Sequence, residues 1–490
     1  MEEGIFGAGD SEAEISRLER PATRTNWMTP DGAAFDLTIP PTVYPPREDT
    51  DLLCQTLRGL GPGKGQKLLE IGCGSGAVSL YAASLGYRVR ACDINPYAVA
   101  ATKANAKHLR HDVDVHEGGP GPRADGSVQQ WSGTQPHDVV VWNLPYLSHD
   151  SSVEEVLGPL EEAALLDTDD KGLVSRLMTQ VSENQLLSKN GIILLLVSGN
   201  ERGLHAEQEA QKNGFAARCV SKHAFDEGDG LRVIAVWNPY TFASIHRFES
   251  LASTNQSALE QSDSVGDLFT ALRQTSGRGR RGRSWSSERR CFAGTWTLAL
   301  GTPSMSPGLM QILAGHAVIA THRILNVNEA SMALKWPNDV IQATGEGVGK
   351  VAGVLVEGTS KGEQSKIVVG IGVNFASAQS AKPSFPIAHL FDAIPELEVG
   401  QYERVLHAII ASYFEHHPRV RGAPMEEHRT VLLGELIRSQ EILGSPFYRN
   451  EKWFIEDLDA QGNLVLRNDR HETVAVPDGE DLKWPLFSVD

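Results

Sequence analysis

Cysteine is scarce in this chain, which has five cysteines among 490 residues. They are Cys54, Cys73, Cys92, Cys219 and Cys291, an odd number at wide spacings with no Cys-x-x-Cys pair. This pattern argues against a disulfide framework and against a structural zinc site, and it is typical of proteins kept in a reducing compartment. We therefore expect a cytoplasmic protein.

Long hydrophobic runs and a basic surplus are also missing. The longest apolar stretch, residues 192–197, is far shorter than the roughly 20 residues that cross a bilayer, and the acidic N-terminus lacks the apolar core of a signal peptide. The net charge is −17. Residues 1–240 contain 21 Lys and Arg against 33 Asp and Glu (−12), and the rest contains 24 against 29 (−5). Because nucleic-acid-binding proteins usually present a basic face, we expect neither membrane association nor a broad DNA-binding surface.

Residues 43–240 alternate short apolar runs with helical patterns, which predicts an α/β domain with a doubly wound, Rossmann-like parallel sheet. Residues 1–42 are polar, and we expect them to be a poorly ordered lead-in. The predicted strands are 67–71, 88–92, 138–142, 191–197 and 231–237, and the predicted helices are 77–85 and 96–109.

A chain of this length is too long for a single core, and the pattern changes after Asn238-Pro239-Tyr240. Residues 245–435 mix strands and helices without strict alternation, which predicts an α+β domain. Residues 436–490 return to short strands, joined in one place by the turn 459–463, and this predicts a small SH3-like antiparallel β-barrel.

A glycine-rich loop, Leu69-Glu70-Ile71-Gly72-Cys73-Gly74-Ser75-Gly76, follows the first predicted strand and opens a helix. Its glycines allow backbone N–H groups to approach a ligand at the helix N-terminus, and Asp93 ends the next strand, where a carboxylate can bind a ribose. A tight turn with a solvated Asp93 is the alternative reading. The sequence Asn143-Leu144-Pro145-Tyr146 ends a later strand, at the edge where such sheets bind ligands.

Together with Pro46-Arg47-Glu48-Asp49-Thr50, these motifs resemble the HemK/PrmC-like S-adenosylmethionine-dependent N-methyltransferases, over about residues 43–238. The resemblance implies methylation of a planar nitrogen, typically the glutamine of the Gly-Gly-Gln tripeptide of a peptide-chain release factor. Leu144 departs from the family pattern, which is usually Asn-Pro-Pro-Tyr. By resemblance, the catalytic residues are Asn143, Pro145 and Tyr146, and the methyl donor contacts Glu48, Thr50, Glu70, Gly72, Gly74, Gly76, Asp93 and Asn143.

Two alternatives stay open for this domain. It could be a non-catalytic module that binds S-adenosylmethionine or a protein. It could also methylate adenine in nucleic acid, because adenine-N6 methyltransferases carry the same motif, although they need a surface to read the target and flip its base.

A second glycine-rich loop, Gly277-Arg278-Gly279-Arg280-Arg281-Gly282, concentrates positive charge in an acidic protein. Arginine side chains bind carboxylates and phosphates, and glycines let the backbone approach a ligand closely. The motifs Ser253-Thr254-Asn255, 335–339, 349–353 and 370–374 accompany it in order. Singly these motifs are ordinary caps and turns.

In this order they closely resemble biotin–protein ligases, over about residues 245–490. The resemblance implies that biotin's carboxylate attacks the α-phosphate of ATP, and that a lysine of a biotin carboxyl carrier domain then takes the biotinyl group from biotinyl-5′-AMP. The helix-turn-helix that some members carry is missing, so we expect no DNA repressor role. A different carboxylic acid, such as lipoate or octanoate, is the alternative substrate.

The resemblance also assigns residues to this second site, with Lys350 and Arg278 as the catalytic pair. The biotin contacts would be Ser253, Thr254, Asn255, Gln274, Arg278 and Gly353. The ATP contacts would be Gly277, Gly279, Arg280, Arg281, Gly282, Trp285, Asn338, Lys350 and Asn374. No residue is singled out as a metal ligand, and Mg²⁺ is expected through the phosphates of ATP.

Overall fold

The computed structural model describes residues 20–120, 128–144, 172–199, 201–225, 230–285, 291–326, 332–344, 347–361, 364–375 and 397–485. The chain divides into two compact units. The first contains Met1–Asn238 and His417–Arg421, and the second contains Pro239–His416 and Gly422–Asp490. Among the described residues, no helix is both long and apolar enough to cross a bilayer.

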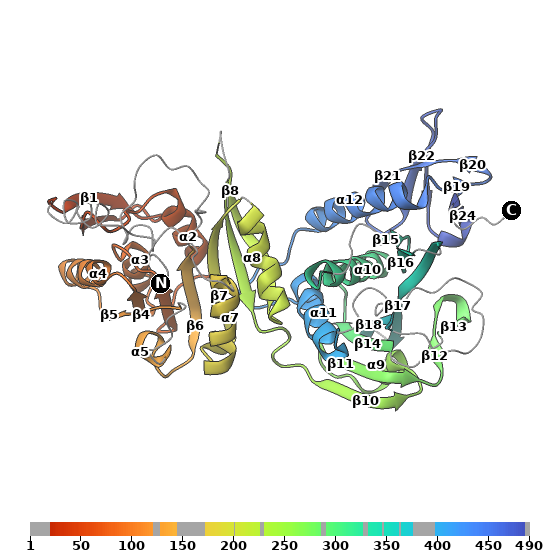
Figure 1. Ribbon diagram of the computed structural model, residues 1–490, viewed down its shortest axis with the longest axis horizontal. Helices are drawn as coiled ribbons and strands as arrows, with labels where there is room; N and C mark the ends of the chain where they lie inside the picture. Colours follow the sequence, from red (N-terminus) through yellow and green to blue (C-terminus); the bar gives the residue numbers. More distant parts are fainter. Residues whose placement is uncertain are drawn as a thin grey trace, which may run out of the picture. The chain divides into compact units, whose positions relative to one another are not determined.

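A seven-stranded sheet in the order β5-β4-β3-β6-β7-β9-β8 forms the centre of the first unit (Figure 1). The first five strands are parallel, whereas β9 is antiparallel to both β7 and β8. The strands are β3 (Lys67–Ile71), β4 (Arg88–Asp93), β5 (Val113–Glu117), β6 (His137–Asn143), β7 (Leu187–Ser198), β8 (Ala216–His223) and β9 (Leu231–Trp237).

The antiparallel end corrects the prediction of a parallel sheet. Only a short connection joins β8 to β9, and such a connection can join antiparallel neighbours but not parallel ones. The sheet is therefore mixed, with the five parallel strands at the end that carries the glycine-rich loop.

Helices cover both faces of this sheet. On one face, side chains of α5, α7 and α8 pack in one core with Leu69 and Ile71 of β3. On the opposite face, Val99 of α4 packs with Ala91 of β4. The helices are α2 (Glu48–Gly59), α3 (Ala77–Ser84), α4 (Pro96–Leu109), α5 (Val128–Ser132), α7 (Leu173–Asn184) and α8 (Glu201–Lys212).

Part of the predicted lead-in is ordered, contrary to expectation. β1 (Thr23–Met28) and β2 (Ala34–Ile39) form an antiparallel hairpin. Burial alternates along β2, with Phe35, Leu37 and Ile39 inside, and Trp27 packs edge-on against Phe35 with ring centroids 5.9 Å apart. This period-two burial stabilises the hairpin against the rest of the unit.

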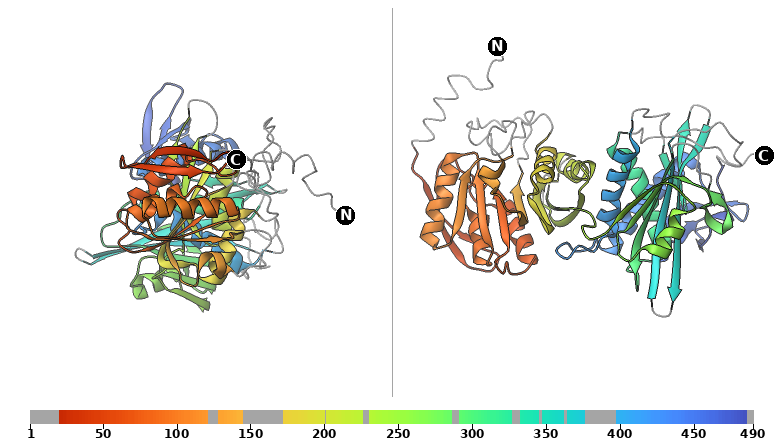
Figure 2. Two further views of the ribbon diagram at one scale, coloured as in Figure 1. Left: turned by 90° about the vertical axis from the view of Figure 1, so that its left-hand side faces the viewer. Right: turned by 90° about the horizontal axis from the view of Figure 1, so that it is seen from below.

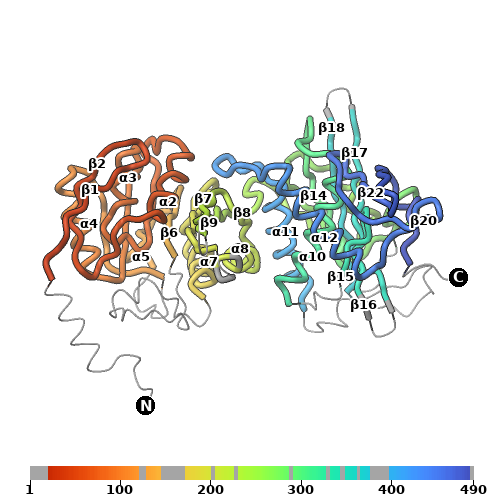
Figure 3. The backbone as a smooth tube through the Cα atoms, turned by 90° about the horizontal axis from the view of Figure 1, so that it is seen from above, coloured from red at the N-terminus to blue at the C-terminus, as the bar shows by residue number. Residues whose placement is uncertain are grey.

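The second unit is also built on a seven-stranded sheet, in the order β10-β11-β14-β18-β17-β16-β15. Only β10 and β11 are parallel. β17 and β18 extend as a pair beyond the neighbouring strands (Figures 2 and 3). The strands are β10 (Ile245–Leu251), β11 (Leu268–Gln274), β14 (Cys291–Leu300), β15 (Met332–Lys335), β16 (Asp339–Thr344), β17 (Gly347–Lys361) and β18 (Gln364–Asn374).

Four longer helices accompany this sheet, and two small sheets follow them. The small sheets are ordered β20-β19-β24 and β21-β22-β23, and the turn 459–463 joins β21 to β22 as predicted. The pairing of the described strands does not close a barrel, so the SH3-like barrel is not confirmed. The elements are α9 (Thr254–Gln261), α10 (Pro307–Ile324), α11 (Val399–Phe414), α12 (Met425–Leu443), β19 (Phe447–Tyr448), β20 (Glu451–Lys452), β21 (Phe454–Leu458), β22 (Leu464–Arg467), β23 (Thr473–Val476) and β24 (Leu482–Lys483).

Candidate functional sites

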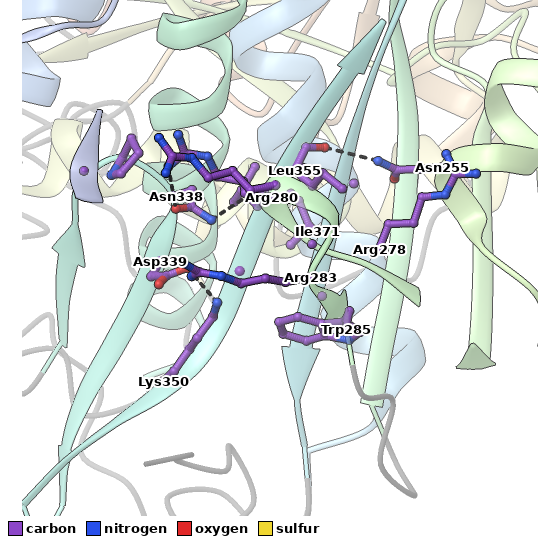
Figure 4. A pocket seen from close by; sticks show the side chains of 18 of the residues that line it. Asn255, Arg278, Arg280, Arg283, Trp285, Asn338, Asp339, Lys350, Leu355 and Ile371 are labelled. Carbon is purple, nitrogen blue, oxygen red and sulfur yellow. Dashed lines mark hydrogen bonds and ion pairs between the residues drawn. The ribbon is translucent and has the colours of Figure 1, made fainter. Parts of the chain in front are cut away.

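A cavity of about 320 Å³ opens in the second unit beside the arginine-rich loop 277–282. The loop lies in a hairpin of β12 (Gly277–Arg278) and β13 (Ser284–Trp285), and Figure 4 shows side chains from the loop and from the strands converging. The predicted residues that line the cavity are Ser253, Thr254, Asn255, Gln274, Arg278, Gly279, Arg280, Arg281, Trp285, Asn338, Lys350 and Gly353. Gly277, Gly282 and Asn374 do not line it. Asn374 is buried, and its Nδ2 donates to the Lys350 carbonyl at 3.1 Å.

The N-terminus of α9 forms one wall of this cavity. Ser253 caps the helix by accepting from the backbone N–H of Gln256. The backbone N–H and the hydroxyl of Thr254 lie 2.8 and 3.1 Å from Oε1 of Gln274. These N–H groups are therefore paired within the protein, and what the wall offers a polar ligand group is its hydroxyl and amide side chains beside the partial positive charge of the helix N-terminus.

Asn255, next along this wall, has both ends of its amide engaged. Its Nδ2 donates to Oε2 of Glu357 at 2.9 Å, and the Thr295 hydroxyl lies 2.6 Å from its Oδ1. A Cβ built on Gly370 would lie 2.0 Å from that Oδ1, so a glycine is required there. The sequence did not indicate Glu357, which lies 102 positions from Asn255 and also accepts from Arg278 at 3.3 Å.

Two paired glycines make a flat floor under Trp285. Gly353 of β17 faces Gly372 of β18 in register, and Cβ atoms built on them would lie 3.0 and 2.6 Å from the indole. The indole nitrogen is buried and has no hydrogen-bond partner among the described residues. Since the ring needs both side chains to be absent, the glycines fix where the indole lies.

Lys350 of β17 extends into the cavity beside this ring. Its ammonium nitrogen lies 2.6 Å from a carboxylate oxygen of Asp339 and 5.4 Å from the ring centroid of Trp285, as Figure 4 shows for the ion pair. Lys335 approaches the same carboxylate at 3.9 Å. Burial lowers the pKa of the Lys335 ammonium, and Asp339 acts in the opposite direction. Asp339 therefore holds two ammonium groups at one side of the cavity.

The arginines of the loop are paired with protein carboxylates. Arg280 and Arg281 both pair with Asp478, and Arg283 lies 2.7 Å from Glu480. Burial acts to raise the pKa of Asp478. The Glu480 backbone N–H and the two arginines outweigh this effect and hold that pKa below its usual value. Sequence reasoning missed both carboxylates, because they lie almost 200 positions from the loop.

In the first unit, the glycine-rich loop adopts left-handed backbone angles. Gly72, Gly74 and Gly76 have φ values of 70°, 53° and 85°, and a Cβ on Gly76 would lie 2.9 Å from Thr102. Such φ values favour glycine. The Gly74 backbone N–H donates to Asp93 at 2.9 Å, so this carboxylate also holds the loop. Burial raises the pKa of Asp93, against the effect of these backbone hydrogen bonds.

Ile94, which follows Asp93, was missed by sequence reasoning. Its side chain is 55% exposed at the carboxyl edge of the sheet, where an apolar surface suits a flat ring. Gly119 leaves space beside it, since a Cβ there would lie 3.5 Å from Cγ2 of Ile94. The sequence could have indicated it, because Ile94 directly follows Asp93, the last residue of β4.

Asn143, at the end of β6, contacts the start of α2. Its Nδ2 donates to Oδ2 of Asp49 at 2.8 Å. Thr50 is buried and its hydroxyl accepts from the Arg47 backbone N–H at 3.3 Å, whereas Glu48 is exposed. Pro145 and Tyr146 lie outside the described residues. The structure thus brings Asn143 to the Pro46–Thr50 motif, but through Asp49, which the sequence did not single out.

Glu70 gives the first unit an expected pH dependence. Burial raises the pKa of its carboxyl to about 8, and the Ser79 hydroxyl contacts it. The carboxyl is protonated in both states below about pH 4.5, whereas between pH 4.5 and 8 it ionises only on unfolding. The unfolding free energy should therefore fall as pH rises through this window, by a few kcal/mol at about 1.4 kcal/mol per unit.

Glu70→Gln should remove this fall, because glutamine stays neutral and can still bond to Ser79. Calorimetric midpoints of the first unit at pH 5 and pH 8 measure it, with the exposed Glu117→Gln as a control. A parallel fall in parent and Glu70→Gln would contradict the assignment.

Comparisons with known proteins separate the two units. A model of the biotin/lipoate A/B protein ligase family matches residues 247–374, and a model of the ribosomal protein L11 methyltransferases (PrmA) matches residues 49–145. The L11 methyltransferase of Thiobacillus denitrificans is 36% identical over 118 residues, which is 24% of this chain and 36% of that protein.

Two further relatives each match a part of the chain. A "Putative protein N5-glutamine methyltransferase" of Methanocaldococcus jannaschii is 30% identical over 206 residues, which is 41% of this chain and 94% of that protein. A biotin–[acetyl-CoA-carboxylase] ligase of Paracoccus denitrificans is 37% identical over 132 residues, or 26% of this chain, and the match spans about half (53%) of its length.

Among solved structures, biotin protein ligase from Aquifex aeolicus with biotin and ATP is 21% identical, with a TM-score of 0.38 over 49% of this chain and 98% of that one.

Proposed function

We propose that the chain is a bifunctional enzyme, because residues 247–374 match the biotin/lipoate A/B protein ligase family and the N-terminal half is similar to a protein N5-glutamine methyltransferase. The C-terminal half attaches biotin to a lysine of a biotin carboxyl carrier domain. The N-terminal half methylates a protein glutamine. We assign residues 43–240 to the methyltransferase, 245–435 to the ligase catalytic domain and 436–490 to a small C-terminal domain in which short strands follow the second half of α12. Five free cysteines support a cytoplasmic setting.

One observation supports the ligase most strongly: Arg278, Arg280, Arg281 and Lys350 line one cavity that ends at the N-terminus of α9. Joining a carboxylate to a triphosphate brings two anions together, so fixed positive groups are the main requirement. A carboxylate oxygen of biotin forms a bond to the α-phosphorus, and pyrophosphate leaves with the electron pair of the broken P–O bond.

We assign roles along the cavity. Ser253, Thr254 and Gln274 hold the polar ring of biotin, Arg278 its carboxylate, and Asn255 shapes that wall. Trp285, which packs on Gly353 and Gly372, and Asn338 form the part of the cavity that binds the adenine of ATP. Lys350 lies at the junction of carboxylate and phosphate. Mg²⁺ would arrive on the phosphates of ATP.

Pyrophosphate release with biotin, lipoate or octanoate as the acid tests the ligase assignment. Release with biotin, followed by transfer to a purified carrier domain, is the expected result. Pyrophosphate release with lipoate or octanoate but not with biotin would show that the enzyme activates a different acid. Release with none of the three acids would contradict the ligase assignment.

The methyltransferase proposal is supported by the glycine-rich loop, Asp93 and Asn143, which meet the same edge of the sheet. S-adenosylmethionine would have its ribose at Asp93 and its adenine on Ile94. Glutamine is preferred as the acceptor because the related N5-glutamine methyltransferase is matched over nearly its full length, whereas the L11 methyltransferase is matched over about a third.

Asn143→Ala should lower methyl transfer by about 10²-fold and weaken donor binding far less, because the reacting nitrogen loses an orienting acceptor whereas the donor loses one of eight assigned contacts. Labelled methyl transfer to a release factor measures the rate. L11 protein and adenine-containing DNA serve as competing acceptors. Donor binding with no transfer to any acceptor would instead favour the non-catalytic module.

A further inference from the structure

Asp49 is a buried carboxylate without a cation. Its side chain lies in the first turn of α2 and the residue is 4% exposed. Oδ2 accepts from Asn143 at 2.8 Å, and Oδ1 accepts from the Thr50 backbone N–H at 2.6 Å and lies 3.2 Å from its hydroxyl. No Lys, Arg or His of the described segments forms an ion pair with it. Burying an uncompensated charge is costly, so a position of this kind calls for a reason.

The contact fixes the orientation of the Asn143 amide. A carboxylate whose contacts are all donors acts only as an acceptor, so it must face the NH₂ of Asn143. A flipped amide would place two oxygens against each other. Oδ1 of Asn143 is therefore directed away from Asp49, and this buried oxygen has no hydrogen-bond partner within the described segments. A buried acceptor left unpaired is unfavourable until a donor arrives.

The first turn of α2, which carries Asp49, is held in place by two contacts of its neighbouring residues. The Arg47 backbone N–H donates to the Thr50 hydroxyl at 3.3 Å, and the helix N-terminus favours a negative side chain in its first turn. From the β1–β2 hairpin, the Trp27 indole N–H donates to Asp51 at 2.8 Å. The first turn of α2 thus has little freedom to move, and neither has the Asn143 amide bonded to it.

We propose that Asp49 is a positioning residue that sets the amide of Asn143 with its carbonyl oxygen toward the methyl acceptor. This inference rests on the proposed methyltransferase function. The site then selects a nitrogen that carries hydrogen, such as a primary carboxamide. One N–H is held by Oδ1 of Asn143. As the N–C bond forms, the donor's S–C bond breaks, the sulfur keeps that electron pair as a neutral thioether, and the nitrogen loses one proton to water.

Asp49→Leu tests the proposal, with Asp49→Asn as a near-isosteric second variant in case the leucine variant folds poorly. Asp49→Leu should lower kcat by about 10²-fold, because Asn143 becomes free to present its NH₂. The dissociation constant for S-adenosylmethionine, measured by calorimetry, should stay within about threefold. Asp49→Asn should lose about tenfold, since its amide can offer either end to Asn143. The exposed Asp112→Asn is the matched control.

The decisive comparison is the double variant Asp49→Leu/Asn143→Ala. If Asp49 acts through Asn143, the double variant transfers methyl no more slowly than Asn143→Ala alone. Additive losses, or an Asp49→Leu kcat within threefold of the parent, would overturn the proposal while leaving the methyltransferase function intact. A parent chain that methylates no acceptor would instead remove the proposed function, and the positioning role with it.

Discussion

Lys350→Met is expected to slow biotinyl-adenylate formation by about 10²–10³-fold. The ammonium of Lys350 reaches the cavity from β17, 2.6 Å from Asp339 and above the ring of Trp285. Methionine keeps much of the length and apolar contact of the side chain but removes the charge. Losing one preorganised electrostatic contact at a reacting group typically costs this much in rate. Biotin-dependent pyrophosphate exchange under saturating ATP measures the step.

Binding experiments distinguish a catalytic loss from a folding defect. Biotin affinity should change by no more than a few-fold in Lys350→Met, because the biotin wall at α9 lies on other elements. Lys483→Met, which removes an exposed lysine from β24, should leave the exchange rate unchanged. A parent-like rate in Lys350→Met would show that the arginines of the loop suffice and that the assigned role is wrong.

Most of the first unit could be predicted because its strands and helices carry local signals. The strand Lys67–Ile71 is a short apolar run that the structure buries almost entirely, and the helix Pro96–Leu109 begins at a proline, which suits the first helical position. The hairpin was also readable, since Phe35, Leu37 and Ile39 alternate with polar residues. The polar composition of the surrounding segment masks this alternation.

The remaining features depend on distant pairings that no local pattern encodes. The antiparallel end of the first sheet follows from the insertion of β9 between β7 and β8. The role of Asp49 depends on its contact with Asn143, which is 94 positions away in the sequence. The role of Asp478 likewise depends on its ion pair with Arg281. Motif residues identify which groups a site contains. The residues that orient or neutralise those groups lie far away in the sequence, and only the folded chain brings them into contact.

Gly372→Ala is expected to raise the KM for ATP by about 10–10²-fold with little change in global stability. The added methyl carbon would lie 2.6 Å from the Trp285 ring, which already packs so closely on the paired Gly353 that a Cβ there would lie 3.0 Å from it. Overpacking at a fixed ring costs about 1–3 kcal/mol, and tenfold in affinity corresponds to about 1.4 kcal/mol. The indole must therefore move off the two glycines, and the loop that carries Trp285 moves away from the part of the cavity that binds ATP.

Gly434→Ala is the matched control, because a Cβ there meets nothing within 4 Å and alanine favours the helical conformation of α12. Initial rates at varied ATP and saturating biotin measure KM, and the tryptophan emission of Gly372→Ala should shift as the buried indole becomes exposed. A normal KM with unchanged emission would mean that the sheet accommodates the methyl group, and the glycine floor would then not be what places Trp285.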